Sequence, residues 1–318
     1  MDEQAYRRVE QRLWDSVDRQ PSERTIRLPR LGVRLRVQEV GEGEPILYLH
    51  GGPNAGATWA PVVAGLPGFR SLLLDRPGTG LSAPLRIAPD NLTEVADAFV
   101  ADVLDALDLE RAHVVASSFG GFLALRSAAT TPARFGRMVQ MACPAGAPGM
   151  AMPAFMRAIA TPGLGRLIAA LPPNERANRS IFRQIGHGSS LDADRIPQVF
   201  LDWYLGLQRH TDTMRNEVRL ISSLASLRGR WDPALLLPED LLARVATPTL
   251  FLWGADDTFG GEDLARRMVT AMPDARLEML AGAGHLPWLD DPAHAAHVLS
   301  GFLCAPEPAG PGSPSATA

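Results

Sequence analysis

The sequence predicts an α/β fold, with a mostly parallel central sheet, helices on both faces of that sheet and an inserted helical cap. Short apolar runs recur along the chain and alternate with longer amphipathic runs, which is the pattern of a parallel sheet covered by helices. A chain of 318 residues is long enough for one large domain with a buried core. Residues 145–242 interrupt the alternation and show no strand rhythm.

Eight short runs are expected to form strands, because they are apolar or alternate between apolar and polar residues. They are residues 24–28, 33–40, 45–49, 71–74, 112–116, 137–141, 249–253 and 276–280. Three longer runs with apolar positions at helical spacing are expected to form helices that cover the sheet. They are residues 92–109, a run that follows the tight turn at residues 117–121 and continues to about residue 131, and about 293–302.

Four further segments complete the predicted domain organisation. Residues 1–22 read as an amphipathic N-terminal helix that Pro21 ends. Residues 23–144 and 243–304 form the core, and residues 145–242 form a helical cap rich in Met, Pro, Gly and Arg. Within the cap, helices are expected at residues 153–170, 197–208 and 214–227. Residues 305–318 are rich in Pro, Gly, Ser and Ala and are expected to be a disordered tail.

Composition excludes several classes of function. The 31 basic residues, all arginine, against 35 acidic ones give a formal charge of −4, so no basic field points to nucleic acid or to a membrane surface. Without lysine, Schiff-base, pyridoxal-phosphate and P-loop chemistry are excluded, and we expect no cofactor. No run approaches the roughly 20 apolar residues of a membrane span, and no signal peptide stands out, so the expected location is cytoplasmic. The expected partner is a small-molecule substrate, and the oligomeric state stays open.

Metal binding is not expected either. The two cysteines, Cys143 and Cys304, cannot build a zinc site or a disulfide framework. His294 and His297 lie three residues apart on the last helix, but no cysteine cluster or HExxH motif accompanies them, so a helix surface is the better interpretation.

The most informative stretch is VVASSFGG, residues 114–121, which reads as a strand, a sharp turn and a helix with Ser118 at its centre. A serine in such a turn is held in a strained conformation that raises its hydroxyl above the edge of the sheet. The turn brings the helix close to the strand, so the residues two before and two after must be small, as Ala116 and Gly120 are. Centring the motif on Ser117 would put two large side chains at these positions. The alternative is a serine that only caps the helix.

Four more motifs follow predicted strands. They are HGGP at residues 50–53, DRPGTGLS at 75–82, WGADD at 253–257 and GAGHLP at 282–287. Together with the turn at Ser118, this ordered set resembles the α/β-hydrolase superfamily, in the capped branch that holds esterases, peptidases and carbon–carbon bond hydrolases. The resemblance covers about residues 24–303 without the cap. It implies a sheet with a catalytic site at the carboxyl ends of its strands.

The resemblance also implies roles for individual residues. Ser118 would be the nucleophile, and His285 would be the base that takes its proton and returns it to the leaving group. Asp257 matches the family pattern G-x-x-D from Gly254 and would support the imidazole, with Asp256 as the rival acid. The chain order Ser, Asp, His fits the family.

The oxyanion hole would combine the backbone N–H groups of Gly52 and Phe119. Gly52 suits this role because a side chain there would crowd the substrate, and Pro53 has no N–H to donate. His50 is expected to order this loop. The DRPGTGLS stretch resembles a structural turn of the family, and we read it as scaffold.

Departures from individual branches narrow the reaction. Haloalkane dehalogenases and epoxide hydrolases carry an aspartate where Ser118 stands, and hydroxynitrile lyases of this fold need a lysine. Proline iminopeptidases differ at Asn54 and Phe119, and meta-cleavage-product hydrolases commonly have Trp where Leu286 stands. What remains is hydrolysis of a carboxylic ester or related acyl bond through an acyl-enzyme. The Met-, Leu- and Pro-rich cap favours a small to medium apolar substrate.

Alternatives stay open at this point. A C–C bond hydrolase, or a biosynthetic acyl-transfer or cyclisation enzyme, would be indicated by a polar cap residue such as Arg183 or Arg195 facing Ser118. A receptor that binds a small molecule without turnover is the alternative outside enzymes. Candidate pocket residues, which could equally be core, are Trp59, Met152, Phe155, Met156 and Trp203.

Overall fold

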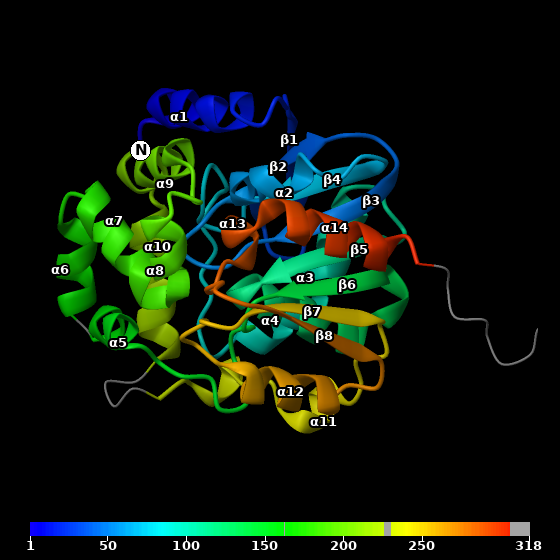
Figure 1. The fold of residues 1–318 in the computed structure, drawn as a ribbon. Coiled ribbons are helices and arrows are strands. Elements are labelled where there is room, and N and C mark those ends of the chain that lie inside the picture. The colour runs from blue at the N-terminus through cyan, green and yellow to red at the C-terminus, as the bar shows by residue number, and fades with distance from the viewer. Residues whose placement is uncertain (162, 226–229, 306–318) are drawn as a thin grey trace, which may run out of the picture.

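The computed structural model, which describes residues 1–161, 163–225 and 230–305, contains one eight-stranded sheet of order β1-β2-β4-β3-β5-β6-β7-β8 (Figure 1). β1 pairs antiparallel with β2, and β2 pairs antiparallel with β4, whereas the other neighbours are parallel. The strands are β1 (Ser22–Leu28), β2 (Val33–Val40), β3 (Glu44–Leu49), β4 (Phe69–Leu74), β5 (Ala112–Ser117), β6 (Phe135–Met141), β7 (Thr249–Gly254) and β8 (Ala275–Leu280).

All eight strands lie where the apolar runs predict them, and the fold class expected from the sequence is confirmed. β5, β6 and β7 are buried along their whole length, which explains why their sequences are nearly continuous apolar runs. The parallel order brings the carboxyl ends of β3, β5, β7 and β8 to one edge of the sheet, so the segments that follow these strands meet there.

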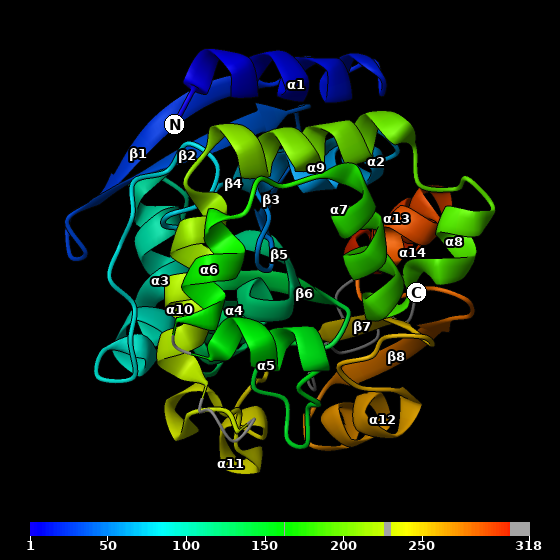
Figure 2. The ribbon, with the colours of Figure 1, turned by 90° about the vertical axis from the view of Figure 1, so that its left-hand side faces the viewer.

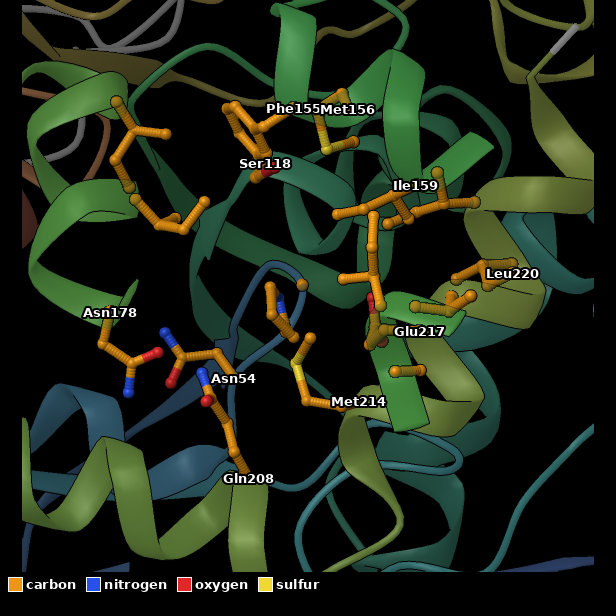
Figure 3. A pocket seen from close by; sticks show the side chains of 18 of the residues that line it. Asn54, Ser118, Phe155, Met156, Ile159, Asn178, Gln208, Met214, Glu217 and Leu220 are labelled. Atoms are coloured by element: carbon orange, nitrogen blue, oxygen red, sulfur yellow. The ribbon is translucent and has the colours of Figure 1, made fainter. Parts of the chain in front are cut away.

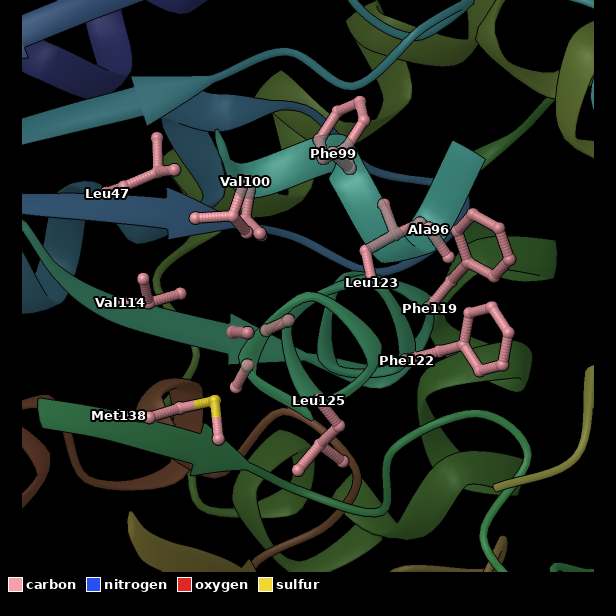
Figure 4. Close-up of a cluster of buried hydrophobic side chains, with 14 of the residues drawn as sticks. Leu47, Ala96, Phe99, Val100, Val114, Phe119, Phe122, Leu123, Leu125 and Met138 are labelled. Carbon is pink, nitrogen blue, oxygen red and sulfur yellow. The ribbon is translucent and has the colours of Figure 1, made fainter. Parts of the chain in front are cut away.

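Helices cover both faces of the sheet and enclose two hydrophobic clusters. On one face, α3 packs on α4 and both contribute to the cluster in Figure 4, where Phe99, Val100 and Leu123 approach Val114 of β5 and Met138 of β6. The other face is covered by α2 and α14. The core helices are α2 (Ala60–Val63), α3 (Leu92–Ala106), α4 (Ser118–Thr130), α11 (Glu239–Leu242), α12 (Glu262–Thr270), α13 (Pro287–Asp290) and α14 (Pro292–Leu303), with 3₁₀ turns η1 (Gly56–Trp59), η2 (Pro132–Arg134) and η4 (Pro233–Leu235).

The N-terminal helix α1 (Glu3–Asp15) is shorter than residues 1–22 and ends well before Pro21. Asp18 takes a left-handed conformation with φ of 52°, which breaks the helical path, and β1 begins directly after Pro21. α1 lies along the cap helix α9 at the top of Figure 1, so it bridges the sheet and the cap.

The segment between β6 and β7 forms a layer of helices over the carboxyl ends of the strands (Figure 2). The run 153–170 splits into two helices, because Thr161 leaves the helical conformation and Gly163 has φ of 85°. The run 214–227 becomes α10, and its residues 226 and 227 lie outside the described residues. The helices are α5 (Ala154–Ala160), α6 (Leu164–Ala170), α7 (Glu175–Phe182), a π turn η3 (Arg183–His187), α8 (Gly188–Asp192), α9 (Gln198–His210) and α10 (Thr213–Leu224).

Residues 175–192 hold three helical segments that the sequence did not predict as a unit. Ile185 and Gly186 have non-helical dihedral angles there, so the chain bends sharply inside the π turn. Apart from residue 305, the tail predicted as disordered lies outside the described residues. Within the described parts of the chain, no helix is long and apolar enough to cross a membrane.

Candidate active site

Ser118 stands at the junction of β5 and α4 with φ of 52°, in the left-handed region that a side chain rarely occupies. A Cβ atom at Gly120 would lie 2.1 Å from the carbonyl oxygen of Leu49, so only glycine lets α4 start this close to β3. Ser118 lines a cavity, whereas the Oγ of Ser117 is buried without a hydrogen-bond partner. The sequence predicted a small residue two positions after Ser118. The close contact between the backbones of α4 and β3 explains this requirement.

Asp257 and His285 come together although 28 positions separate them in the sequence. Nδ1 of His285 lies 2.9 Å from Oδ2 of Asp257, and both side chains are buried. The N–H groups of Cys143 and Phe259 also donate to the Asp257 carboxylate, at 3.0 and 2.9 Å. Asp256 is exposed. This geometry favours Asp257 over its neighbour as the partner of the imidazole.

His285 and Ser118 line the same cavity. Within the part of the chain that the structure describes, the His285 ring forms a hydrogen bond with Asp257 and none with the Ser118 hydroxyl. Such a catalytic hydrogen bond often tightens only in the complex with substrate. The ring of Phe259 packs against the imidazole at 4.3 Å between centroids and limits its movement.

Gly52 and Phe119, the two residues expected to donate to an oxyanion, line the cavity beside Ser118. Phe119 lies in the first turn of α4, where backbone N–H groups have no partner within the helix. A Cβ atom at Gly52 would lie 2.0 Å from Oε2 of Glu217, so a side chain at this position would displace the carboxylate of that cap residue. The sequence predicted that a side chain at residue 52 would crowd the substrate, but the group nearest to that position is the carboxylate of Glu217.

His50 orders the loop that carries Gly52. Its Nδ1 contacts the carbonyl oxygen of Gly51 at 2.6 Å, and its Nε2 accepts the N–H of Arg76 at 3.2 Å, a pattern that fits a neutral ring. Burial, together with the positive charge of Arg76, holds the pKa of His50 well below its usual value, although the Gly51 carbonyl acts in the opposite direction. The loop is therefore held by an uncharged histidine at neutral pH.

The turn after β4 does more than the scaffold role predicted for it. Nη2 of Arg76 donates to Oε1 of Glu217 on α10 at 2.8 Å and to the Gly51 carbonyl at 3.0 Å. The backbone of the same turn binds the cap, because Gly80 donates its N–H to Oγ1 of Thr213 at 2.9 Å and the Gly78 carbonyl accepts from Asn216 at 2.8 Å. Sequence reasoning missed Arg76 and Glu217, and no motif marks their pairing.

A second cap contact lies behind His285. Asp290 accepts hydrogen bonds from Nδ1 of His187, from the hydroxyl of Ser190 and from the N–H of Gly284. Nε2 of His187 accepts the N–H of Leu286 at 3.1 Å. The N–H of His285 itself donates to the carbonyl of Ile185 at 2.8 Å. The backbone on both sides of the proposed base is thus tied to the cap by groups that sequence reasoning did not single out.

The cavity has a volume of about 460 Å³ and is mostly apolar, with walls from α4, α5, α6, α7, α9 and α10 (Figure 3). Phe155 and Met156 line it as expected. The other pocket candidates, Trp59, Met152 and Trp203, are buried residues outside its lining. Burial, aided by the negative charge of Glu217, raises the pKa of Tyr204 in the lining to about 12, so its phenol stays protonated at neutral pH.

Arg183 and Arg195 do not face Ser118. Arg183 pairs with Asp192, and the guanidinium of Arg195 donates to the hydroxyl of Ser190; neither arginine belongs to the cavity lining. Neither arginine therefore supplies the polar cap group that would indicate C–C bond cleavage.

The described residues hold no group of three or more His, Cys, Asp or Glu side chains placed to bind a metal ion. His294, considered with His297 as a remote metal pair, contacts Glu278 at 2.7 Å. Cys143 donates its backbone N–H to Asp257, and burial raises the pKa of its thiol well above the usual value, which makes it a poor nucleophile.

Comparisons with known proteins identify the family of this chain. The model of the alpha/beta hydrolase family matches residues 46–296. A 2-hydroxy-6-oxononadienedioate/2-hydroxy-6-oxononatrienedioate hydrolase of Cupriavidus pinatubonensis is 30% identical over 263 residues, which are 79% of this chain and 84% of that protein. A 2-hydroxy-6-oxo-6-phenylhexa-2,4-dienoate hydrolase of Comamonas testosteroni is 29% identical over 268 residues, with 79% and 84% covered.

Solved structures share the fold. A carboxylesterase of Bacillus subtilis superimposes with a TM-score of 0.70 at 20% identity, covering 95% of this chain and 99% of that one. A 2-hydroxy-6-oxo-6-phenylhexa-2,4-dienoate hydrolase of a Rhodococcus strain superimposes with a TM-score of 0.68 at 21% identity, covering 90% of this chain and all of the other.

The fold and the cavity at the strand ends define an α/β enzyme, and the chain belongs to the alpha/beta hydrolase family. It is a hydrolase.

Proposed function

We propose that the chain is a serine hydrolase that cleaves a carboxylic ester or related acyl bond of a small to medium apolar substrate. The observation that carries the proposal is the strained Ser118, which shares one cavity with a histidine whose Nδ1 is bonded to a buried carboxylate. A left-handed serine stores strain that packing alone would not require, and such strain is typical of functional positions. The mostly apolar walls of the cavity suit an apolar acyl or alcohol group.

In this mechanism the Ser118 hydroxyl attacks the substrate carbonyl while Nε2 of His285 takes its proton. Asp257 fixes the ring with Nδ1–H toward the carboxylate and stabilises the imidazolium that forms. The N–H groups of Gly52 and Phe119 donate to the oxyanion, each worth about 10²–10³ in rate. His285 then gives the proton to the leaving alcohol, and water releases the acid from the acyl-enzyme through the same steps.

A second candidate is hydrolysis of a carbon–carbon bond, which the named activities of the relatives from Cupriavidus and Comamonas favour. The substrates in those names are carboxylates, and a carboxylate in a cavity needs a cationic partner. Among the described lining residues there is no arginine. Ester cleavage is therefore the first proposal.

The proposal is tested with p-nitrophenyl esters of short acids. Wild-type protein should release p-nitrophenol, and Ser118→Ala and His285→Ala should lower kcat by at least about 10³-fold, because each removes a group that acts in a single unit. Asp257→Asn should cost at least about 100-fold, whereas Asp256→Asn, the same change one residue earlier, should stay within about threefold of wild type. Equal effects of the two aspartate variants would contradict the assignment.

The two candidate reactions are separated by a direct competition. Wild-type protein is given a neutral ester and, separately, a 2-hydroxy-6-oxo-dienoate, whose loss is followed by its visible absorbance. The proposal expects the higher kcat/KM for the ester. A higher kcat/KM for the dienoate would make C–C cleavage the first proposal.

A further inference from the structure

Glu217 is a buried carboxylate on the wall of the proposed substrate cavity. It lies on α10 beside Met214, Val218 and Leu220, all of which also line the cavity (Figure 3). Its Oε2 approaches the position that a Cβ atom of Gly52 would occupy, so it faces the loop proposed to bind the oxyanion. A carboxylate in an apolar wall requires a partner, because the desolvation of an unpaired charge costs several kcal/mol.

That partner is Arg76, which is 1% exposed and does not belong to the cavity lining. Its Nη2 is shared between Oε1 of Glu217 and the Gly51 carbonyl. The guanidinium carbon lies 5.0 Å from the centre of the Phe119 ring, so the cation is also held against the second residue of the proposed oxyanion hole. Nη2 of Arg76 is thus occupied by contacts within the protein, whereas its buried Nε has no hydrogen-bond partner among the described residues. Glu217 lines the cavity and Arg76 does not.

The rest of the lining carries little charge. Besides Glu217, its titratable side chains are His285 and Tyr204. Its other polar side chains among the described residues are neutral, namely those of Asn54, Asn174, Asn178, Ser118, Ser180, Gln208 and Trp231. A substrate carboxylate entering this space would be desolvated near another carboxylate and would find no free cation among the described lining residues. Like charges brought together in a poorly solvated site repel each other strongly.

We propose that Glu217 determines the charge of the substrate: it occupies Arg76 and makes the cavity select acyl groups without negative charge. The inference rests on the proposed ester hydrolysis, because selectivity is read from turnover at Ser118. Removing the Glu217 charge leaves Arg76 as an unpaired cation at the same wall. The variant should then accept the acyl carboxylates that the wild-type protein rejects.

The test compares two esters of equal chain length, mono-p-nitrophenyl glutarate, which is anionic, and its methyl ester, which is neutral. For the wild-type protein, kcat/KM should favour the neutral ester by about 100-fold or more. Glu217→Gln should reduce this ratio at least about tenfold, mainly through a lower KM for the anionic ester. The double variant R76M/E217M has no cation to offer, so its ratio should lie between the two.

Glu42→Gln is the matched control, because Glu42 is exposed and the change alters net charge identically. Its ratio of kcat/KM values should equal that of wild type.

If Glu217→Gln fails to fold, charge selection is tested by inhibition of the wild-type protein with two alkyl boronic acids. The one with a terminal carboxylate should bind at least about tenfold more weakly than the one without. Equal binding of the boronic acids, or equal ratios in wild type and Glu217→Gln, overturns the inference while ester hydrolysis stands. No turnover of either ester by wild type overturns the proposed function itself.

Discussion

Next to the proposed catalytic groups, the cap is attached to the core at two places that differ in chemistry. On the histidine side, His187 and Ser190 of the cap bind Asp290, and the carbonyl of Ile185 binds the N–H of His285. On the oxyanion side, α10 binds the turn after β4 through side chains, and one of these side chains also lines the cavity. The first attachment positions a catalytic group through its backbone, and the second sets the charge of the space that the substrate enters.

A third part of the cap, formed by α5 and α6, takes part in neither set of these hydrogen bonds. α5 and α6 pack on α10 and on each other (Figure 2). α6 and its C-terminal end expose Leu164, Leu167 and Leu171 to solvent. Side chains of this part, among them Phe155 and Ile168, form the outer wall of the cavity. The cap is therefore hydrogen-bonded to the core next to the proposed catalytic groups, whereas this outer part packs on other cap helices and on the core ring of Phe259, which Phe155 contacts at 6.3 Å between centroids.

The largest expected effect comes from the histidine side. The Asp290 carboxylate accepts three buried hydrogen bonds. In Asp290→Asn, an NH₂ donor replaces one of the two acceptor oxygens, so the free energy of unfolding should fall by about 3 kcal/mol. Because Gly284 precedes His285, kcat should fall at least about tenfold, with a smaller change in KM. Urea unfolding and ester kinetics measure the two effects.

Asp291→Asn is the control for this prediction. Asp291 caps α14 by accepting the N–H of His294, and asparagine caps helices about as well as aspartate, so stability and kcat should stay near wild type. Equal losses in the two variants would show that the histidine-side contact has no special role.

A smaller effect is expected on the oxyanion side. Thr213→Val removes the acceptor for the N–H of Gly80, and Asn216→Ala removes the donor to the Gly78 carbonyl, so each should cost about 1 kcal/mol of unfolding free energy. The variants should change KM more than kcat, because α10 is part of the cavity wall. A loss as large as that of Asp290→Asn would remove the contrast between the two attachments.

Stability should also depend on pH through His50 beside the oxyanion loop. Its pKa is low in the folded protein, so below pH 6.5 the unfolded chain binds a proton that the folded one does not. Stability from this group is complete above that pH and falls by up to about 1.4 kcal/mol per pH unit below it. Between pH 7 and 5, the free energy of unfolding should change less with pH for His50→Gln than for wild type. An equal pH dependence of the two proteins would contradict a neutral His50 ring in the folded protein.

The smallest effect expected is a gain in stability at the strained serine. Ser118→Gly relieves a left-handed conformation, so the free energy of unfolding should exceed that of Ser118→Ala by about 1 kcal/mol, although both variants are inactive. Thermal unfolding of the two variants measures the difference. If Ser118→Gly were less stable than Ser118→Ala, the strain at this turn would be absent.

The fold and the residues of the proposed triad could be read from the sequence because their signals are local. Each strand is a short apolar run, and each motif with Ser118, Asp257 or His285 follows such a run directly. Parallel topology then brings those strand ends together, so a local pattern and one rule of sheet architecture suffice. The roles of the three residues remain predictions that the kinetics of the variants test.

The cap contacts could not be read from the sequence in this way. Arg76 and Glu217 are 141 residues apart, and a glutamate on an amphipathic helix looks like any solvated residue until the helix is placed. His187 follows a bend at Ile185 and Gly186 that no helical pattern shows, and its partner Asp290 lies 103 residues away. Tertiary packing between cap and core decides these contacts, and no local spacing encodes them.

The most direct test of the account is the site of covalent labelling. Wild-type protein is treated with a fluorophosphonate, digested, and the modified residue is located by fragmentation mass spectrometry, which separates the cavity-facing Ser118 from the buried Ser117. The account predicts one stoichiometric adduct on Ser118, and its loss in His285→Ala at neutral pH. An adduct on another residue, or undiminished labelling of Ser118→Ala, would contradict it.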